Sequence, residues 1–259
     1  MPNAITYDLA GKHALVTGGG TGIGAAIALA LARAGAQVTI CGRRLAELNA
    51  SASRHSNIHA RAADVTDQGS LQRLYRDAQA ERGAFGIVVA NAGAAESAPA
   101  EKISPALWDE IVGVNLTGAF LSVQPALAAM RERGWGRIVF IASTAGLKGY
   151  AYVAPYVAAK HGVVGLARAL ALETAKTGIT VNAVCPGFAE TPMLARAVDR
   201  IVAATERTGA DTRAALEVNN PQGRFIKPDE VADAVMWLCA GDSGAITGQA
   251  ISVSGGETW

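Results

Sequence analysis

The chain has 259 residues, a formal net charge of +1 and a hydrophobic content of 50%, with only 17% charged residues. This balance gives no electrostatic reason to expect a nucleic acid or an anionic membrane as partner. The three cysteines, Cys41, Cys185 and Cys239, form no CxxC or Cys/His cluster, so we expect no metal site. Unclustered thiols of this kind are typical of a cytoplasmic protein.

Apolar segments are short throughout the chain. Residues 1–9 mix polar side chains without an apolar run, so we expect no signal peptide. The longest apolar runs, such as 87–90 and 138–142, have the length of a strand and are too short to span a bilayer. We therefore expect a soluble protein with no membrane partner.

Short β-branched runs alternate with Ala- and Leu-rich segments along almost the whole chain. The predicted strands are 13–17, 37–41, 58–62, 86–90, 137–142, 180–184 and 250–253. The predicted helices are 22–34, 67–81, 108–133, 155–177 and 228–238. Strands that are apolar on both faces, alternating with helices, predict an α/β protein of residues 1–259. Its architecture would be a single-domain Rossmann fold with a doubly wound, parallel, seven-stranded sheet covered by helices on both faces.

A glycine-rich turn follows the first predicted strand, in the segment Gly18-Gly19-Gly20-Thr21-Gly22-Ile23-Gly24. Glycines let backbone N–H groups approach a phosphate, and the N-terminus of the next helix favours an anion. No Lys-Ser/Thr pair follows, which argues against an ATP-type P-loop. We interpret the turn as a dinucleotide site, although glycines also form tight turns that bind no ligand.

The second predicted strand ends in Arg43 and Arg44, where a dinucleotide fold meets the adenosine ribose. An acidic residue there would bind the 2′-hydroxyl of NAD(H), whereas an arginine accepts the 2′-phosphate of NADP(H). The sequence therefore favours NADP(H), with NAD(H) as the alternative. In the competing interpretation, the two arginines are solvated charges at the start of the next helix.

The third motif is Ser143 followed by Tyr156 and Lys160. A spacing of four in a helix places Tyr156 and Lys160 on one face, where an ammonium would lower the pKa of the phenol. A phenol tuned in this way can exchange a proton with a carbonyl or alcohol. Neighbouring His161 would point away from this face, so we interpret it as structural.

Residues 188–225 contain no strand candidate and form an excursion too long for an ordinary connection. It follows the carboxyl end of a strand, where ligands bind in open α/β sheets, so we interpret it as a substrate lid. The alternative is a surface insertion with no function. Met193 and Leu194 would line an apolar pocket or serve as ordinary packing residues.

Taken in order, these residues resemble the short-chain dehydrogenase/reductase family over essentially the full length. The motifs that carry the resemblance are Thr17-Gly18-xxx-Gly22-Ile23-Gly24, Asp64-Val65, Asn91-Ala92-Gly93, Asn115, Ser143, Tyr156-xxx-Lys160 and Pro186-Gly187 with Thr191. Jointly they are highly specific. Ala90 departs from the pattern, since family members often carry a second Asn there.

The resemblance implies a role for each motif. Tyr156 would be the acid or base and would also contact the cofactor. Lys160 would tune Tyr156 and hold the nicotinamide ribose, and Ser143 would orient the carbonyl. Asn115 would complete a proton relay through a water. Around the dinucleotide, the residues implied are Asp64 and Val65 at the adenine, Asn91, Ala92 and Gly93 on the adenosine side, and Pro186, Gly187 and Thr191 at the nicotinamide.

Several segments are also similar to polyketide ketoreductases and 3-oxoacyl or 3-hydroxyacyl thioester enzymes. This similarity implies a homotetramer, with residues 255–259 near an interface between subunits. The leading hypothesis is an NADPH-dependent ketoreductase of a 3-oxoacyl thioester or similar ketone. The alternatives are an NAD-dependent dehydrogenase of a 3-hydroxyacyl-CoA or another secondary alcohol, and a non-catalytic dinucleotide sensor.

Overall fold

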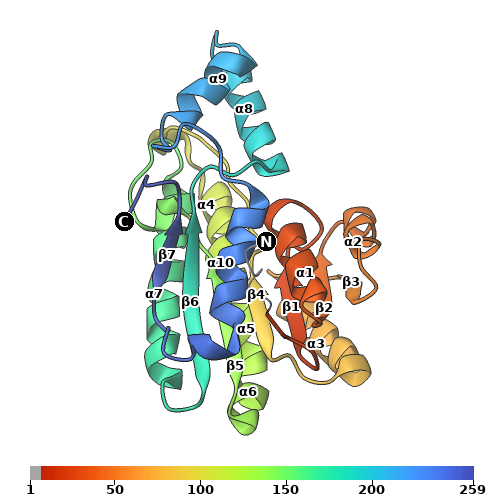
Figure 1. The fold of residues 1–259 in the computed structure, drawn as a ribbon. Coiled ribbons are helices and arrows are strands. Elements are labelled where there is room, and N and C mark those ends of the chain that lie inside the picture. The colour runs from red at the N-terminus through yellow and green to blue at the C-terminus, as the bar shows by residue number, and fades with distance from the viewer. Residues whose placement is uncertain (1–6) are drawn as a thin grey trace, which may run out of the picture.

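The computed structural model describes residues 7–259. The expectation that residues 1–9 form no signal peptide therefore falls mostly outside the described residues. All strands of its sheet are parallel, in the order β3-β2-β1-β4-β5-β6-β7 (Figure 1). The strands are β1 (His13–Thr17), β2 (Gln37–Gly42), β3 (Ile58–Ala62), β4 (Ile87–Ala90), β5 (Gly136–Ile141), β6 (Ile179–Pro186) and β7 (Ala250–Val253). The predicted doubly wound, seven-stranded Rossmann fold is confirmed, with strand ends shifted by one or two residues.

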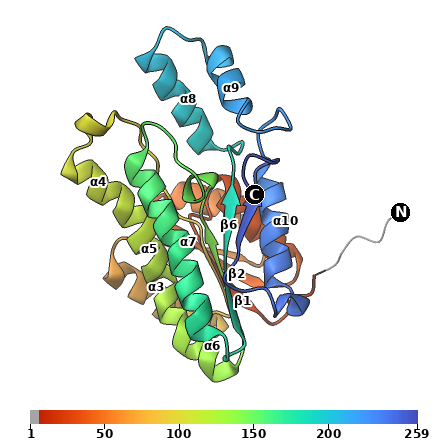
Figure 2. The same ribbon diagram turned by 90° about the vertical axis from the view of Figure 1, so that its left-hand side faces the viewer.

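Helices cover both faces of the sheet (Figure 2). They are α1 (Gly22–Arg33), α2 (Leu45–Ala52), α3 (Gln68–Arg82), α4 (Pro105–Val112), α5 (Gly118–Val123), α6 (Leu127–Arg133), α7 (Ala154–Thr174), α8 (Pro192–Ala204), α9 (Gly209–Glu217) and α10 (Pro228–Cys239). Short 3₁₀ turns lie at Ala100–Lys102, Gln124–Ala126, Thr144–Gly146 and Gly241–Ser243.

Each central strand contributes side chains to two separate cores. In β1, Ala14 and Val16 pack with α1 and α10, whereas Leu15 packs with α3, α5 and α7 on the opposite face. In β5, Val139 and Phe140 divide between the two cores in the same way. Burial on both faces explains why these strands are apolar throughout and lack polar alternation.

The predicted helix 108–133 is interrupted in the structure. It comprises α4, a π-helical turn at Gly113–Thr117, α5, the 3₁₀ turn Gln124–Ala126 and α6. Ser104 caps the start of α4 through its side chain, which accepts from the Leu107 N–H. Gly113 begins the π-turn and Gly118 follows it, and Pro125 lacks a backbone donor at the second interruption.

By length and composition alone, the stretch Pro105–Arg133 could cross a membrane, since an 18-residue window within it has a mean hydropathy of 1.4. This stretch is longer than the apolar runs considered from the sequence. In the structure, Ala119, Val123, Ala126 and Met130 from this stretch pack against the sheet in the second core. One face of the stretch is therefore part of the core.

The excursion 188–225 contains α8 and α9, which stand above the carboxyl edge of the sheet at the top of Figure 1. No strand lies within it; an isolated parallel bridge joins Ala189 to Ile226 at its base. Leu194, Val198 and Phe225 form a small core of their own inside the excursion. Helices α2, α8 and α9 were not predicted from the sequence. α2 and α9 are short, and α8 lies in the excursion, away from the sheet.

Candidate functional site

The glycine turn connects β1 to α1 at the carboxyl edge of the sheet. Gly18 and Gly22 have φ angles of +66° and +54°, which favour glycine over any residue with a side chain. Asn91, just after β4, donates from its side-chain amide to the Thr17 carbonyl at 2.8 Å, and its backbone N–H donates to the Thr17 hydroxyl. Asn91 thus fixes the turn from the neighbouring strand.

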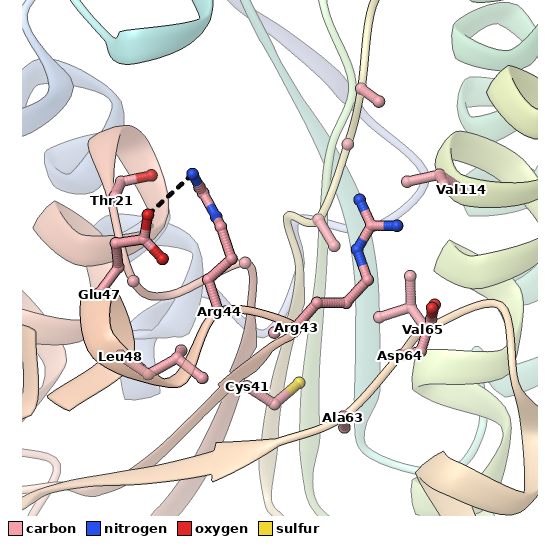
Figure 3. Close-up of a pocket in the computed structure, with 16 residues that line it drawn as sticks. Thr21, Cys41, Arg43, Arg44, Glu47, Leu48, Ala63, Asp64, Val65 and Val114 are labelled. Atoms are coloured by element: carbon pink, nitrogen blue, oxygen red, sulfur yellow. Dashed lines mark ion pairs between the residues drawn. The ribbon is translucent and has the colours of Figure 1, made fainter.

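A pocket opens beside this turn (Figure 3). Its lining contains eight of the residues expected to hold a dinucleotide: Gly18, Thr21, Arg43, Arg44, Asp64, Val65, Ala92 and Gly93. The other lining residues are Gly20, Cys41, Gly42, Glu47, Leu48, Ala63, Ala94 and Val114. Gly22, Ile23 and Gly24 lie in the turn and the start of α1 but not among the lining residues.

The two arginines differ in their surroundings. Arg44 is the N-cap residue of α2 and pairs with Glu47 at 2.8 Å, so the helix-start interpretation holds for this residue. Arg43 extends to the opposite side of the pocket, toward Asp64 and Val114 (Figure 3). The pKa of Asp64 is lowered mainly because the Thr66 backbone N–H donates to it, with a smaller contribution from the charge of Arg43.

Ser143, Tyr156 and Lys160 meet at the end of β5. Lys160 is buried, donates to the Ile141 carbonyl at 2.8 Å, and its Nζ lies 5.5 Å from the centre of the Tyr156 ring. Burial lowers the pKa of Lys160 to about 8. The Ser143 hydroxyl accepts from the Ala145 N–H at 3.1 Å.

The expected shift of the Tyr156 pKa is wrong for this structure. Its pKa is raised because the hydroxyl is withdrawn from water, and a hydrogen bond with Ser143 opposes the shift only in part. The Lys160 ammonium, which lies 5.5 Å from the centre of the ring and donates to the Ile141 carbonyl, does not reverse this shift.

Asn115 lies in the π-helical turn and is buried. Its amide nitrogen donates to the carbonyls of Ala94 and Ile111 at 2.7 and 2.8 Å, whereas its Oδ1 is buried without a partner. A Cβ atom at Gly93 would lie 2.8 Å from this oxygen and 3.8 Å from Lys160 Nζ. The site thus holds an unpaired acceptor next to an ammonium, an arrangement suited to a polar ligand group or a water.

The third side of the site comes from the segment that follows β6. Pro186 ends this strand, and the Gly187 N–H donates to the Val253 carbonyl at 3.1 Å. Thr191 caps α8 by accepting from the Leu194 N–H at 3.3 Å. A Cβ atom at Gly22 would lie 3.1 Å from Thr191 Cγ2, so α8 begins directly against the glycine turn.

Other candidate residues lie outside this constellation. His161 is exposed, with Nδ1 next to the Val157 carbonyl at 2.9 Å. Leu194 is buried in the small core of the excursion, as the packing interpretation predicts, and Met193 is half-buried. Among residues 7–259, no group of three or more His, Cys, Asp or Glu side chains could hold a metal ion.

Sequence reasoning missed one cluster next to this site, formed by Lys148, Tyr150 and Glu257. Tyr150 and Lys148 both contact the Glu257 carboxylate. The motif order contains no signal for it, because Glu257 comes from the far end of the chain and is brought in only by the fold.

Comparisons with known proteins identify the family to which the chain is similar. A family model of short chain dehydrogenases matches residues 12–201. The chain is 38% identical over 258 residues to D-beta-hydroxybutyrate dehydrogenase of Cupriavidus necator, covering 96% of this chain and 98% of that protein. It is 39% identical over 244 residues to acetoacetyl-CoA reductase of Rhizobium meliloti, covering 94% and 97%. A crystal structure of an actinorhodin polyketide ketoreductase variant with NADPH superposes with a TM-score of 0.92 at 38% identity, covering 95% and 97%.

Proposed function

Because the chain belongs to the short-chain dehydrogenase family, whose members act on CH–OH and C=O groups, we propose that it is an NADPH-dependent ketoreductase. Its substrate is a 3-oxoacyl thioester or a similar ketone. The observation that carries the proposal is the convergence of Ser143, Tyr156, Lys160 and the unpaired Asn115 oxygen next to the dinucleotide pocket. Because the family consists of dehydrogenases and reductases, we no longer favour the hypothesis of a non-catalytic dinucleotide sensor.

The pocket and the segments next to it suit a dinucleotide. The turn bearing Gly18, Thr21, Gly22, Ile23 and Gly24 cradles the pyrophosphate, and Asp64 and Val65 contact the adenine. Asn91, Ala92 and Gly93 flank the adenosine, while Pro186, Gly187 and Thr191 face the nicotinamide. When bound, the dinucleotide supplies or accepts the hydride. Arg43 reaches over the pocket with no acidic residue at the end of β2, which supports NADPH as the preferred cofactor.

Tyr156 donates the proton that the reduced carbonyl oxygen requires. Its raised pKa keeps the hydroxyl protonated at neutral pH, which suits an acid in the reductive direction. When the ketone is bound, Ser143 donates its hydroxyl proton to the same carbonyl oxygen and thereby orients the ketone. Lys160, at the ring of Tyr156, stabilises the phenolate left after proton transfer.

The proton then has to be replaced. In the proposed relay a water lies between Asn115 Oδ1, which has no hydrogen-bond partner in the described residues, and the Lys160 ammonium. Through this water, protons pass from solvent to Lys160 and on to Tyr156. The two carbonyls that receive the Asn115 amide protons hold its oxygen in this orientation.

Residues 188–225 act as a lid over the substrate. Arg200 of α8 supports this proposal, because it bonds the Glu96 carboxylate at 2.8 Å and the Ala95 carbonyl at 3.0 Å across the site. A homotetramer is supported by large exposed apolar side chains, among them Leu172 of α7, 82% exposed, and Trp237 of α10. The three buried, unpaired cysteines suit a cytoplasmic location.

The second candidate is an NAD-dependent dehydrogenase of a 3-hydroxyacyl-CoA or another secondary alcohol. One observation favours it, namely that Glu47 already occupies Arg44 and leaves a single arginine for a 2′-phosphate. Absorbance kinetics with acetoacetyl-CoA, using NADPH and NADH in parallel, separate the candidates. Turnover mainly with NADPH supports the ketoreductase, and turnover with NADH alone supports the second candidate.

A further inference from the structure

Glu257, near the carboxyl end of the chain, is the centre of a cluster with Lys148 and Tyr150. The Glu257 side chain is only 1% exposed, although it is close to the C-terminus. It accepts a hydrogen bond from the Tyr150 hydroxyl and pairs with Lys148 Nζ at 3.0 Å. Burial and the Glu257 carboxylate both raise the pKa of Tyr150, so this hydroxyl stays protonated and donates.

The cluster borders the end of the site where the substrate binds. The Tyr150 hydroxyl also bonds the Thr144 hydroxyl at 2.6 Å, and Thr144 directly follows Ser143. On its other side, the Tyr150 ring packs edge-on against Phe188 at 6.1 Å. A Cβ atom at Gly187 would lie 2.9 Å from Glu257 Oε2. Glu257 therefore lies next to the two segments that follow β5 and β6, on the side away from solvent.

Two cations near the lid, Lys148 and Arg200, are each paired with a carboxylate. Lys148 is 38% exposed, and its ammonium is neutralised by the buried Glu257 carboxylate. Arg200, the cation contributed by α8, is paired with Glu96 at 2.8 Å. A carboxylate substrate would need an uncompensated cation to offset the loss of its hydration, and both of these cations are already paired.

We propose that Glu257 determines substrate specificity by neutralising Lys148, so that the site favours β-keto esters and thioesters, whose carboxyl group carries no charge, over free 3-oxo acids. This inference rests on the proposed ketone reduction and names its substrate class. It also distinguishes the chain from its D-beta-hydroxybutyrate dehydrogenase relative, whose named substrate carries a free carboxylate.

Acetoacetate and ethyl acetoacetate test this directly, because both present the same ketone and only the acid is charged. In each reaction the ketone carbon gains a hydride from NADPH and its oxygen gains a proton, giving NADP⁺ and a secondary alcohol. We compare kcat/KM for the two substrates in the native protein and in Glu257→Gln. The substitution frees the Lys148 ammonium, so the ratio of acid to ester should rise about tenfold, the scale of one unpaired charge nearby.

Two further variants fix the sign of the effect. Lys148→Gln leaves the carboxylate unpaired and should lower the ratio below that of the native protein. The double variant Lys148→Gln with Glu257→Gln should return the ratio close to the native value. Glu173→Gln, which breaks the Arg131 pair near the far end of α7, is the matched control and should leave the ratio unchanged.

An unchanged ratio in Glu257→Gln, with ethyl acetoacetate still reduced, would overturn the inference. If the native protein reduces neither compound, the proposed function fails separately. Calorimetric titration of 3-hydroxybutyrate and its ethyl ester into the NADP⁺-loaded protein then gives the ratio of acid to ester as a ratio of affinities. Tighter binding of the acid by Glu257→Gln supports the inference, and equal binding contradicts it.

Discussion

The unpaired amide oxygen of Asn115 and the ammonium of Lys160 both approach Gly93. A Cβ atom at Gly93 would lie 2.8 Å from Asn115 Oδ1 and 3.8 Å from Lys160 Nζ. The close approach of Asn115 is therefore possible only because residue 93 has no side chain. It brings the π-helical turn of one core segment close to the helix that carries Tyr156.

Replacing Asn115 with Leu should lower both stability and activity. The loss of its amide leaves the Ala94 and Ile111 carbonyls without their donor, at a cost of roughly 1–3 kcal/mol in the free energy of unfolding. Urea unfolding measures this cost, and kcat under conditions where the variant is folded measures the relay. A folded Asn115→Leu protein with native kcat would contradict the relay.

Lys160 should make stability depend on pH on the alkaline side. Burial lowers its pKa from 10.5 to about 8, so the unfolded chain binds more protons between these values. The free energy of unfolding should therefore rise as the pH increases from about 8 to 10.5. Lys160→Met removes this contribution, and denaturant unfolding across that range should show a smaller pH slope. Equal slopes for the two proteins would show that Lys160 is not held at a lowered pKa.

The two arginines at the pocket should differ in their effect on cofactor affinity. Arg43→Ala should weaken NADPH binding about tenfold or more, because the 2′-phosphate loses a charge-assisted hydrogen bond. Arg44→Ala should have a smaller effect, since Glu47 already pairs with that residue. Fluorescence titration with NADPH and NADH measures both, and NADH serves as the control that lacks the phosphate. The proposed NADPH preference is wrong if Arg43→Ala weakens both cofactors equally.

Arg200→Ala should loosen the lid without disturbing the pocket for the dinucleotide. It removes the bonds from α8 to Glu96 and to the Ala95 carbonyl. We expect a higher KM for the ketone, an unchanged Kd for NADPH, and faster hydrogen exchange in α8. Native exchange rates in α8 together with a native KM would argue against a closing role for this segment.

The sequence was informative where one local pattern determines the outcome. Apolar β1 and β5 had to be buried on both faces, and the glycines after β1 required a tight turn at the carboxyl edge of the sheet. The break of the long helix at Asn115 was harder to predict, because the spacing of apolar residues remains helical before and after the π-turn.

Tertiary burial accounts for the remaining differences. The Tyr156–Lys160 spacing correctly suggested proximity but gave the wrong direction for the pKa of Tyr156, since withdrawal from water dominates there. The role of Arg44 depended on Glu47, three residues further along α2. Glu257 reaches the site through contacts between β7 and β6, which no local pattern records.

The most direct test of the account compares NADPH oxidation by the native protein and by Tyr156→Phe with acetoacetyl-CoA as substrate. The account expects the native protein to turn over, and the variant to lose about 10²- to 10⁴-fold in kcat, the usual contribution of a general acid. NADPH binding, followed by fluorescence, should stay close to native, because the variant keeps the pocket intact. A Tyr156→Phe protein that reduces the ketone at the native rate would contradict the central claim that Tyr156 supplies the proton.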